Sequence, residues 1–377
     1  MRLDLEHVAI PEETDATERA WEVVRVAYAE REPSTPRPQR ARLLVGIATA
    51  SVTAALVAVA VSPAGSGLLH SIRQEIGLAH ASPALTRLPA PGALLVTSKA
   101  GPWLVQPDGS KRLLGQYLQA SLSPHGLFVA VTRPHELLAV DPQGNVRWSL
   151  ARLRRITLPR WAPDGYRIAY LDGASLRIVA GDGTGDRGFA DTVAPVAPAW
   201  RPSIANEHVL AFSSAAGQLE LYSVDDNALY ARHRLAVVPL QLLWSSDGAR
   251  LVALSRHEIS VFDHNGRPLG SIQIARRALA AAFAPQSHQL AVILSGTRSD
   301  AVAFNVDRPG VPPRELFAGS GHFSALTWSP NGRWLLIAWP TANQWLFVSH
   351  DGRATAVADI AAQFQGNQAP APAGWCC

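Results

Sequence analysis

The stretch Trp328-Ser-Pro-Asn-Gly-Arg-Trp-Leu-Leu-Ile-Ala-Trp339 decides the fold, because it places a large apolar side chain, a tight turn and an apolar strand in direct succession. Pro and Asn-Gly are typical turn residues, and a short apolar run bounded by turns is typical of a buried strand. Similar stretches begin at five earlier positions, and we call the six starting residues the anchors: Leu122, Trp161, Trp200, Trp244, Phe283 and Trp328. Successive anchors are 39, 39, 44, 39 and 45 residues apart. The chain therefore contains an internal repeat with a period of about 40 residues.

A second repeated element is an apolar strand that ends four residues before a turn residue, usually glycine. It occurs seven times, and four copies carry dipeptides that accept positive φ: Asp108-Gly109, Asp182-Gly183, Asn265-Gly266 and Asp351-Gly352. Such dipeptides are typical of hairpin turns. Seven hairpins at intervals of about 40 residues correspond to four short strands per repeat, which is the period of a β-propeller blade. We therefore predict an all-β fold, a seven-bladed β-propeller, with a six-bladed ring as the alternative.

The pattern Trp-Ser-Pro-Asp-Gly followed by an apolar strand resembles the repeats of TolB-like and WD-repeat-like β-propellers over roughly residues 90–365. Trp161, Trp244 and Trp328 match this pattern closely, whereas the other three anchors depart from it. The resemblance implies a ring of blades whose central faces bind other molecules, because loops from all the blades converge there. Within each blade, we expect the anchor to serve as a large apolar plug between neighbouring sheets.

The first repeat lacks an anchor, since seven hairpins accompany only six anchors. Another chain segment must complete the first blade, because the ring would otherwise have an open edge. We predict that Val357-Ala-Asp-Ile-Ala-Ala-Gln-Phe364 adds this strand and buries Val357, Ile360 and Phe364. The propeller then spans residues 92–366, and residues 367–377 form a flexible tail whose removal from Pro370 onward is nearly neutral. In the six-bladed alternative, Ala93–Leu114 is an accessory hairpin.

Residues 43–62 carry no charged side chain and predict one transmembrane helix before the propeller. A helix of this length extends about 30 Å, which is the thickness of a hydrocarbon core. Three arginines lie between residues 37 and 42, so the positive-inside rule places the N-terminus in the cytoplasm and the propeller outside the cell. Residues 63–91 would form a stalk and a Pro-rich linker. The alternative is a signal peptide cleaved at Ala58-Val-Ala60.

Residues 1–42 form the expected cytoplasmic tail, in which residues 15–31 predict a short amphipathic helix bounded by capping and proline signals. Nothing in the tail can cover its apolar face, so we predict that Trp21, Val24 and Tyr28 bind a protein partner. A membrane-surface helix or a marginally stable tail is the alternative. The layout resembles single-pass anti-sigma regulators of bacteria, although the tail lacks the cysteine of their usual zinc motif.

The composition and the motifs exclude several functions. With 47% hydrophobic and 17% charged residues, the chain has ample apolar material for a core, which excludes disorder as its main state. The net charge of +4 comes from scattered arginines and does not favour nucleic-acid binding. Cys376 and Cys377 are the only cysteines, the histidines show no metal-ligand spacing, and no Gly-x-Ser-x-Gly motif is present. Gly183-Thr-Gly-Asp-Arg-Gly188 lies in a hairpin of an all-β repeat, so it is no phosphate-binding loop. We expect no metal, no cofactor and no enzymatic activity.

Together, these features predict a bacterial protein that is integral to the cell membrane through one span. It displays a binding or sensing propeller outside the cell and contacts a cytoplasmic protein, such as a sigma factor, through its N-terminal helix. A propeller enzyme of the lyase or hydrolase class, or a structural protein of the cell envelope, is the alternative.

Overall fold

The computed structural model describes residues 82, 84–202 and 207–377. The expected cytoplasmic tail, the transmembrane segment and the stalk up to residue 81 lie outside the described residues, so these expectations stay predictions. In the described part of the chain, no helix is long and apolar enough to cross a membrane.

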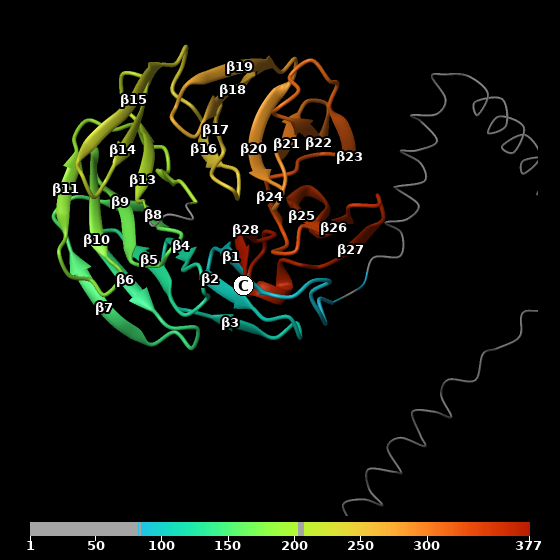
Figure 1. The fold of residues 1–377 in the computed structure, drawn as a ribbon. Helices are drawn as coiled ribbons and strands as arrows, with labels where there is room; N and C mark the ends of the chain where they lie inside the picture. Colours follow the sequence, from blue (N-terminus) through green and yellow to red (C-terminus); the bar gives the residue numbers. More distant parts are fainter. Residues whose placement is uncertain (1–81, 83, 203–206) are drawn as a thin grey trace, which may run out of the picture. The chain divides into compact units, whose positions relative to one another are not determined.

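Seven antiparallel sheets of four strands each are the blades of a closed ring (Figure 1). The expected seven-bladed propeller is thus confirmed, and the six-bladed alternative is wrong. In blades 2 to 7, the strands follow one another in chain order from the inside of the ring outward. Blade 1 differs, because its innermost strand comes from the C-terminal end of the chain.

The strand bounds follow the repeat pattern. From the inside outward, the strands of blades 1 to 3 are β28 (Ala371–Cys376), β1 (Ala93–Ser98), β2 (Gly101–Val105) and β3 (Lys111–Leu113); β4 (Gln119–Leu122), β5 (Val129–Arg133), β6 (Glu136–Val140) and β7 (Val146–Ala151); and β8 (Ile156–Trp161), β9 (Arg167–Asp172), β10 (Ser175–Ala180) and β11 (Arg187–Ala190).

Blades 4 to 7 are built in the same way. Their strands are β12 (Ala199–Trp200), β13 (Val209–Ser213), β14 (Gln218–Ser223) and β15 (Ala228–Arg234); β16 (Gln241–Trp244), β17 (Arg250–Leu254), β18 (Glu258–Asp263) and β19 (Pro268–Gln273); β20 (Arg277–Phe283), β21 (Gln289–Ser295), β22 (Arg298–Asn305) and β23 (Arg314–Ser320); and β24 (Ala325–Trp328), β25 (Trp334–Trp339), β26 (Gln344–Ser349) and β27 (Ala354–Val357). Two short 3-10 helices, η1 (Pro340–Ala342) and η2 (Ala362–Phe364), belong to the last part of the chain.

The core lies between the blades rather than inside any one of them. The second strand of most blades is almost wholly buried, as in β13 and β25, because neighbouring sheets cover both of its faces. This explains why these strands are continuous apolar runs instead of alternating sequences. Outer strands such as β7 and β19 are mostly exposed and carry more polar residues.

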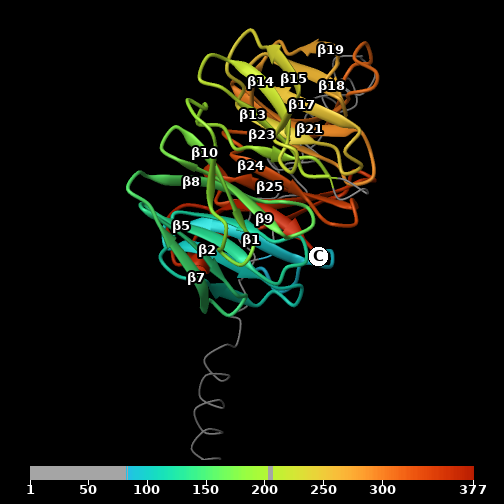
Figure 2. The same cartoon turned by 60° about the vertical axis from the view of Figure 1, so that its left-hand side comes forward.

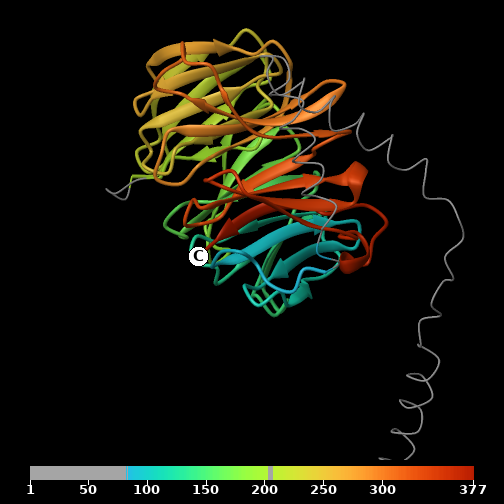
Figure 3. The same ribbon diagram turned by 90° about the vertical axis from the view of Figure 1, so that its right-hand side faces the viewer.

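The seventh anchor is Trp375, which β28 brings to the inside of blade 1. It pairs with Leu94 of β1. In the same way, each of the other anchors pairs with an apolar residue on the second strand of its own blade. Its side chain is 7% exposed, its indole N–H donates to the carbonyl oxygen of Pro91 at 3.1 Å, and its ring meets Phe347 edge-on. Figures 2 and 3 show the red β28 strand beside the cyan strands of blade 1. The prediction that a C-terminal segment closes the ring is confirmed.

The prediction that residues 357–364 form the closing strand is wrong, however. Val357 ends β27, the outermost strand of blade 7, and the chain then turns into η2. Val357, Ile360 and Phe364 are buried as expected, and the Phe364 ring contacts those of Trp103 and Trp345. These residues fill the space between blades 7 and 1 without pairing with β1.

The expected flexible tail at residues 367–377 is likewise corrected, because it contains the closing strand. Cys376 and Cys377, which directly follow the seventh anchor, are joined to each other by a disulfide. Removal of this segment from Pro370 onward therefore cannot be neutral.

Candidate functional site

Trp21, Val24 and Tyr28 lie outside the described residues, so their binding of a partner stays a prediction. All six sequence-derived anchors are described. The four tryptophans are buried, and Leu122 and Phe283 are partly buried.

Three anchors form hydrogen bonds between neighbouring blades. The indole N–H groups of Trp200, Trp244 and Trp328 donate to the carbonyl oxygens of Arg160, Ala199 and Ala282, over 3.0, 3.1 and 3.3 Å. Each acceptor is the residue directly before the preceding anchor. This geometry supports a structural role for the anchors, and it also fixes the main chain of the residue that precedes each of them.

The axial channel is the candidate functional site. It encloses about 550 Å³ and is lined by residues from the innermost strands of six blades. The innermost strand of blade 4, β12, has only two residues and does not line it. Residues directly before the anchors form one ring around the channel: Ser121, Arg160, Leu243, Ala282, Thr327 and Gly374. Among the described residues that line the channel, Arg160 carries the only charge.

The Arg160 side chain has solvent-accessible surface, but this surface faces the channel and the channel walls surround the guanidinium. The shielding from water lowers the pKa of the guanidinium, although arginine remains protonated at neutral pH. Its Nη1 donates to the adjacent carbonyl oxygen of Pro159 at 3.0 Å. No carboxylate in the described part of the chain forms an ion pair with it.

A second ring around the channel consists of the residues three positions before the anchors. It includes two glutamines. Gln119 accepts the main-chain N–H of Leu158 at 2.5 Å, and Gln241 accepts that of Ala281 at 2.7 Å. Leu158 lies within a β-bulge of β8, which leaves its main-chain donor outside the ladder. Ala281 lies just after a β-bulge of β20, and the inner edge of this strand has no partner strand. Each side-chain oxygen is thereby fixed, and the Nε2 group of each amide has no acceptor among the described residues.

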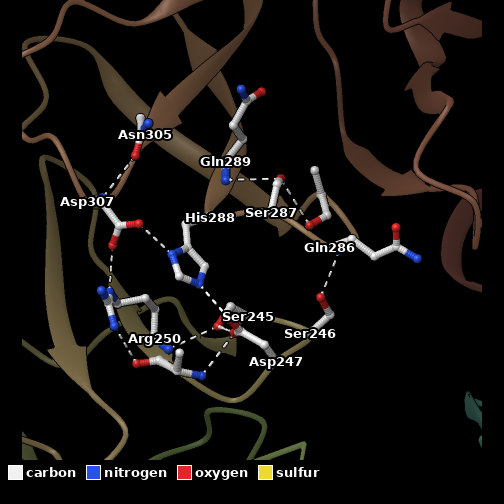
Figure 4. A network of polar contacts seen from close by, with 12 residues as sticks. Ser245, Ser246, Asp247, Arg250, Gln286, Ser287, His288, Gln289, Asn305 and Asp307 are labelled. Carbon is white, nitrogen blue, oxygen red and sulfur yellow. Dashed lines mark hydrogen bonds and ion pairs between the residues drawn. The ribbon is translucent and has the colours of Figure 1, made fainter.

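A polar network also joins blades 5 and 6 (Figure 4). His288 lies between two carboxylates, with Nε2 2.9 Å from Asp247 and Nδ1 2.5 Å from Asp307. Arg250 Nε donates to Asp307 at 2.6 Å. Burial alone would lower the pKa of His288, but its hydrogen bonds to Asp307 and Asp247 outweigh burial and raise that pKa. Burial similarly opposes ionisation of Asp247, yet hydrogen bonds from Ser245, Ala249 N–H and His288 lower its pKa to about 2.

An equivalent network joins blades 3 and 4. His208 lies between Asp164 and Asp225, with its Nδ1 2.6 Å from Asp225, and Arg167 also pairs with Asp225. Both nitrogens of each histidine are engaged, so neither ring offers a free nitrogen to a substrate. In the described residues, no group of three or more His, Cys, Asp or Glu side chains is placed to hold a metal ion. We therefore assign these networks to the joining of blades.

Two cavities larger than the channel lie at other positions. One of about 660 Å³ is bounded by the chain entering the propeller, around Leu85–Pro91, and by Trp334 and Phe347. Another of about 1090 Å³ lies between blades 4 and 5, where Arg201, Glu207 and Arg232 line it. Each adjoins residues outside the described ranges, whereas no residue that lines the axial channel is next to such a segment in the chain.

Sequence reasoning missed Arg160, Gln119 and Gln241. A usable signal was nevertheless present, because side chains alternate along a strand. The anchor faces the space between blades. The residues one and three positions before it line the channel instead. Comparing those positions across the anchors would have singled out one arginine among small or uncharged side chains.

No protein-family model and no curated protein matches the chain. Solved structures do match it at low identity. The β-propeller domain of Cps50 (Swd1) from Myceliophteria thermophila is 14% identical, with 64% of this chain and 86% of that chain covered and a TM-score of 0.50. Hydrazine synthase from Kuenenia stuttgartiensis is 14% identical, with 70% and 78% covered and a TM-score of 0.51. A functionally unknown protein from Desulfotomaculum acetoxidans is 12% identical, with 74% and 98% covered and a TM-score of 0.58. These likenesses show the WD40-like β-propeller fold.

Proposed function

We propose that this chain is a bacterial binding module of the TolB-like type, anchored by one membrane span, whose propeller takes a small ligand into its axial channel outside the cell. The observation that carries the binding role is the channel itself. Its walls combine apolar side chains with hydrogen-bond donors that lack protein acceptors, which is typical of a small-molecule site. The N-terminal helix would report to a cytoplasmic protein such as a sigma factor.

A plug in the channel tests the binding role. A Cβ at Gly374 would meet no atom, and Gly374 lines the channel, so we expect the ring of Gly374→Phe to occupy it. The full-length chain and the variant, both in lipid nanodiscs, are screened by ligand-observed NMR against one set of anionic, neutral and cationic fragments. The plug is expected to abolish the hits. Gly310→Phe, whose Cβ also meets no atoms and which lies outside the channel, serves as the control. Hits that survive the plug would contradict a binding role for the channel.

Topology is tested with protease added to intact spheroplasts. Because three arginines precede the apolar segment at residues 43–62, we expect digestion of the propeller and protection of the tail. A mature protein that lacks residues 1–60 would instead support the signal-peptide alternative.

The role of the N-terminal helix is tested by adding a charge to its apolar face. Val24→Glu should abolish capture of purified sigma factor by the full-length chain, because the partner would have to bury an unpaired carboxylate. Val26→Glu on the polar side of the predicted helix is the matched control. Equal capture by both variants and the wild type would contradict the proposed contact.

A further inference from the structure

The strongest unassigned feature of the propeller is a positive charge in a confined space that has no counterion among the described residues. Arg160 belongs to a ring whose other members are serine, leucine, alanine, threonine and glycine. Elsewhere in the described propeller, arginines that are less exposed than Arg160 have acidic partners; Arg152 and Arg177 both pair with Asp186. Arg160 donates only to the carbonyl oxygen next to it in the chain.

We propose that the axial channel binds an anion, a carboxylate or phosphate group on a small apolar body, with Arg160 as its charge partner. This inference rests on the proposed binding function and names the ligand class for the same site. A planar guanidinium presents several donors in a fork that matches the oxygens of both groups. The channel walls reduce the solvation of Arg160. The electrostatic attraction between Arg160 and a bound anion is therefore stronger than at an arginine in open solvent.

The other polar groups of the channel favour the same class of ligand. Gln119 and Gln241 each use their carbonyl oxygen within the wall, which leaves an amide N–H₂ group as the part available to a ligand. Thr327, in the ring that contains Arg160, adds a hydroxyl. The channel thus offers donors without a described acidic acceptor, so a cationic ligand would meet repulsion from Arg160 and find no carboxylate.

The apolar part of the proposed ligand follows from the rest of the wall. Leu158, Leu243 and Leu326 line the same space as Arg160, together with several alanines. A volume of about 550 Å³ lies within the usual range for small-molecule sites. We therefore expect an anion with a compact apolar body to bind better than inorganic phosphate alone, because water leaves the leucine side chains on binding.

The test compares benzoate with benzamide, which has nearly the same shape and no charge. Full-length chain in lipid nanodiscs is titrated with each by NMR, and phenyl phosphate and inorganic phosphate are titrated in parallel. Benzoate or phenyl phosphate should bind at least about ten-fold more tightly than benzamide, as a charge-assisted hydrogen bond predicts. Whichever anion binds more tightly identifies the favoured group.

Arg160→Gln should remove that preference, and Arg160→Lys should keep part of it. Neither change alters the main-chain carbonyl that accepts from Trp200, and far-UV circular dichroism checks the fold. Arg112→Gln removes an exposed arginine on the outermost strand of blade 1 and should leave the preference unchanged. Retention of the preference in Arg160→Gln would overturn the inference.

The plug separates this inference from the proposed function. If benzamide and the anions bind equally and Gly374→Phe abolishes all binding, the channel is a binding site but the anion inference is wrong. If no probe binds, or if binding survives the plug, both proposals fail.

Discussion

Replacing Trp375 by alanine tests the most consequential contact of the fold, the anchor that closes the ring. Truncation of a buried tryptophan costs about 3–5 kcal/mol, and Trp375 is only 7% exposed. The lost hydrogen bond to Pro91 adds about 0.5–1.5 kcal/mol. A loss of roughly 3.5–6.5 kcal/mol follows. This loss is a large share of the usual net stability of about 5–15 kcal/mol.

Urea unfolding of the full-length chain, followed by far-UV circular dichroism, measures this loss. Trp244→Ala removes the anchor of blade 5, whose four strands are consecutive in the chain, and should lower the free energy of unfolding by a similar amount. Leu153→Ala, at a side chain that is 97% exposed, should change the free energy of unfolding by less than about 0.5 kcal/mol. If Trp375→Ala behaved like Leu153→Ala while Trp244→Ala was costly, the assignment of Trp375 as the seventh anchor would be refuted.

The remaining predictions concern the whole closing strand, one titrating side chain and one turn. Deletion of residues 371–377 should destabilise the protein at least as much as the single substitution of its anchor, because β1 then loses its inner partner; an unchanged urea midpoint would contradict this. His288 has a raised pKa in the folded state, so its contribution is complete below the unfolded value of about 6.5 and is lost as the pH rises through the folded value. His288→Gln should therefore lower the urea midpoint more at pH 5.5 than at pH 9, and an equal effect at both would argue against the charged pair. Gly248→Ala places a Cβ 2.1 Å from the carbonyl oxygen of Pro202 at a positive φ, whereas Gly352→Ala meets only the positive φ; the first should therefore melt at a lower temperature.

The sequence predicted the blade number because anchor and turn are local signals repeated in each blade. Trp375 escaped notice because neither Pro nor Asp/Asn-Gly follows it, and because its partner, the second strand of blade 1, lies near residue 94. Periodicity also explains the error at residues 357–364. Val357, Ile360 and Phe364 recur at three- and four-residue intervals, which is helical spacing. The segment indeed leaves β27 at Val357 and enters η2 instead of forming a new strand.

The channel was harder to predict, since no motif marks it. Arg160 becomes conspicuous only when the residues preceding the anchors are placed around one axis. The role of Gln119 depends on a β-bulge in the next blade, and a bulge of this kind leaves no clear signature in a single sequence.

Because blade 1 is built from both ends of the propeller, its assembly is tied to the time course of synthesis. Pro91 and Trp375 are 284 residues apart in the chain. A ribosome adding about 5–20 residues per second needs roughly 15–60 s to bridge that interval, and β1 offers an unpaired edge throughout. Early in its life the nascent chain is therefore an open arc that can pair with a neighbour, and a prematurely terminated product keeps that exposed edge. The last strand acts as a seal, and only a chain translated through it can hide the edge at which aggregation would begin.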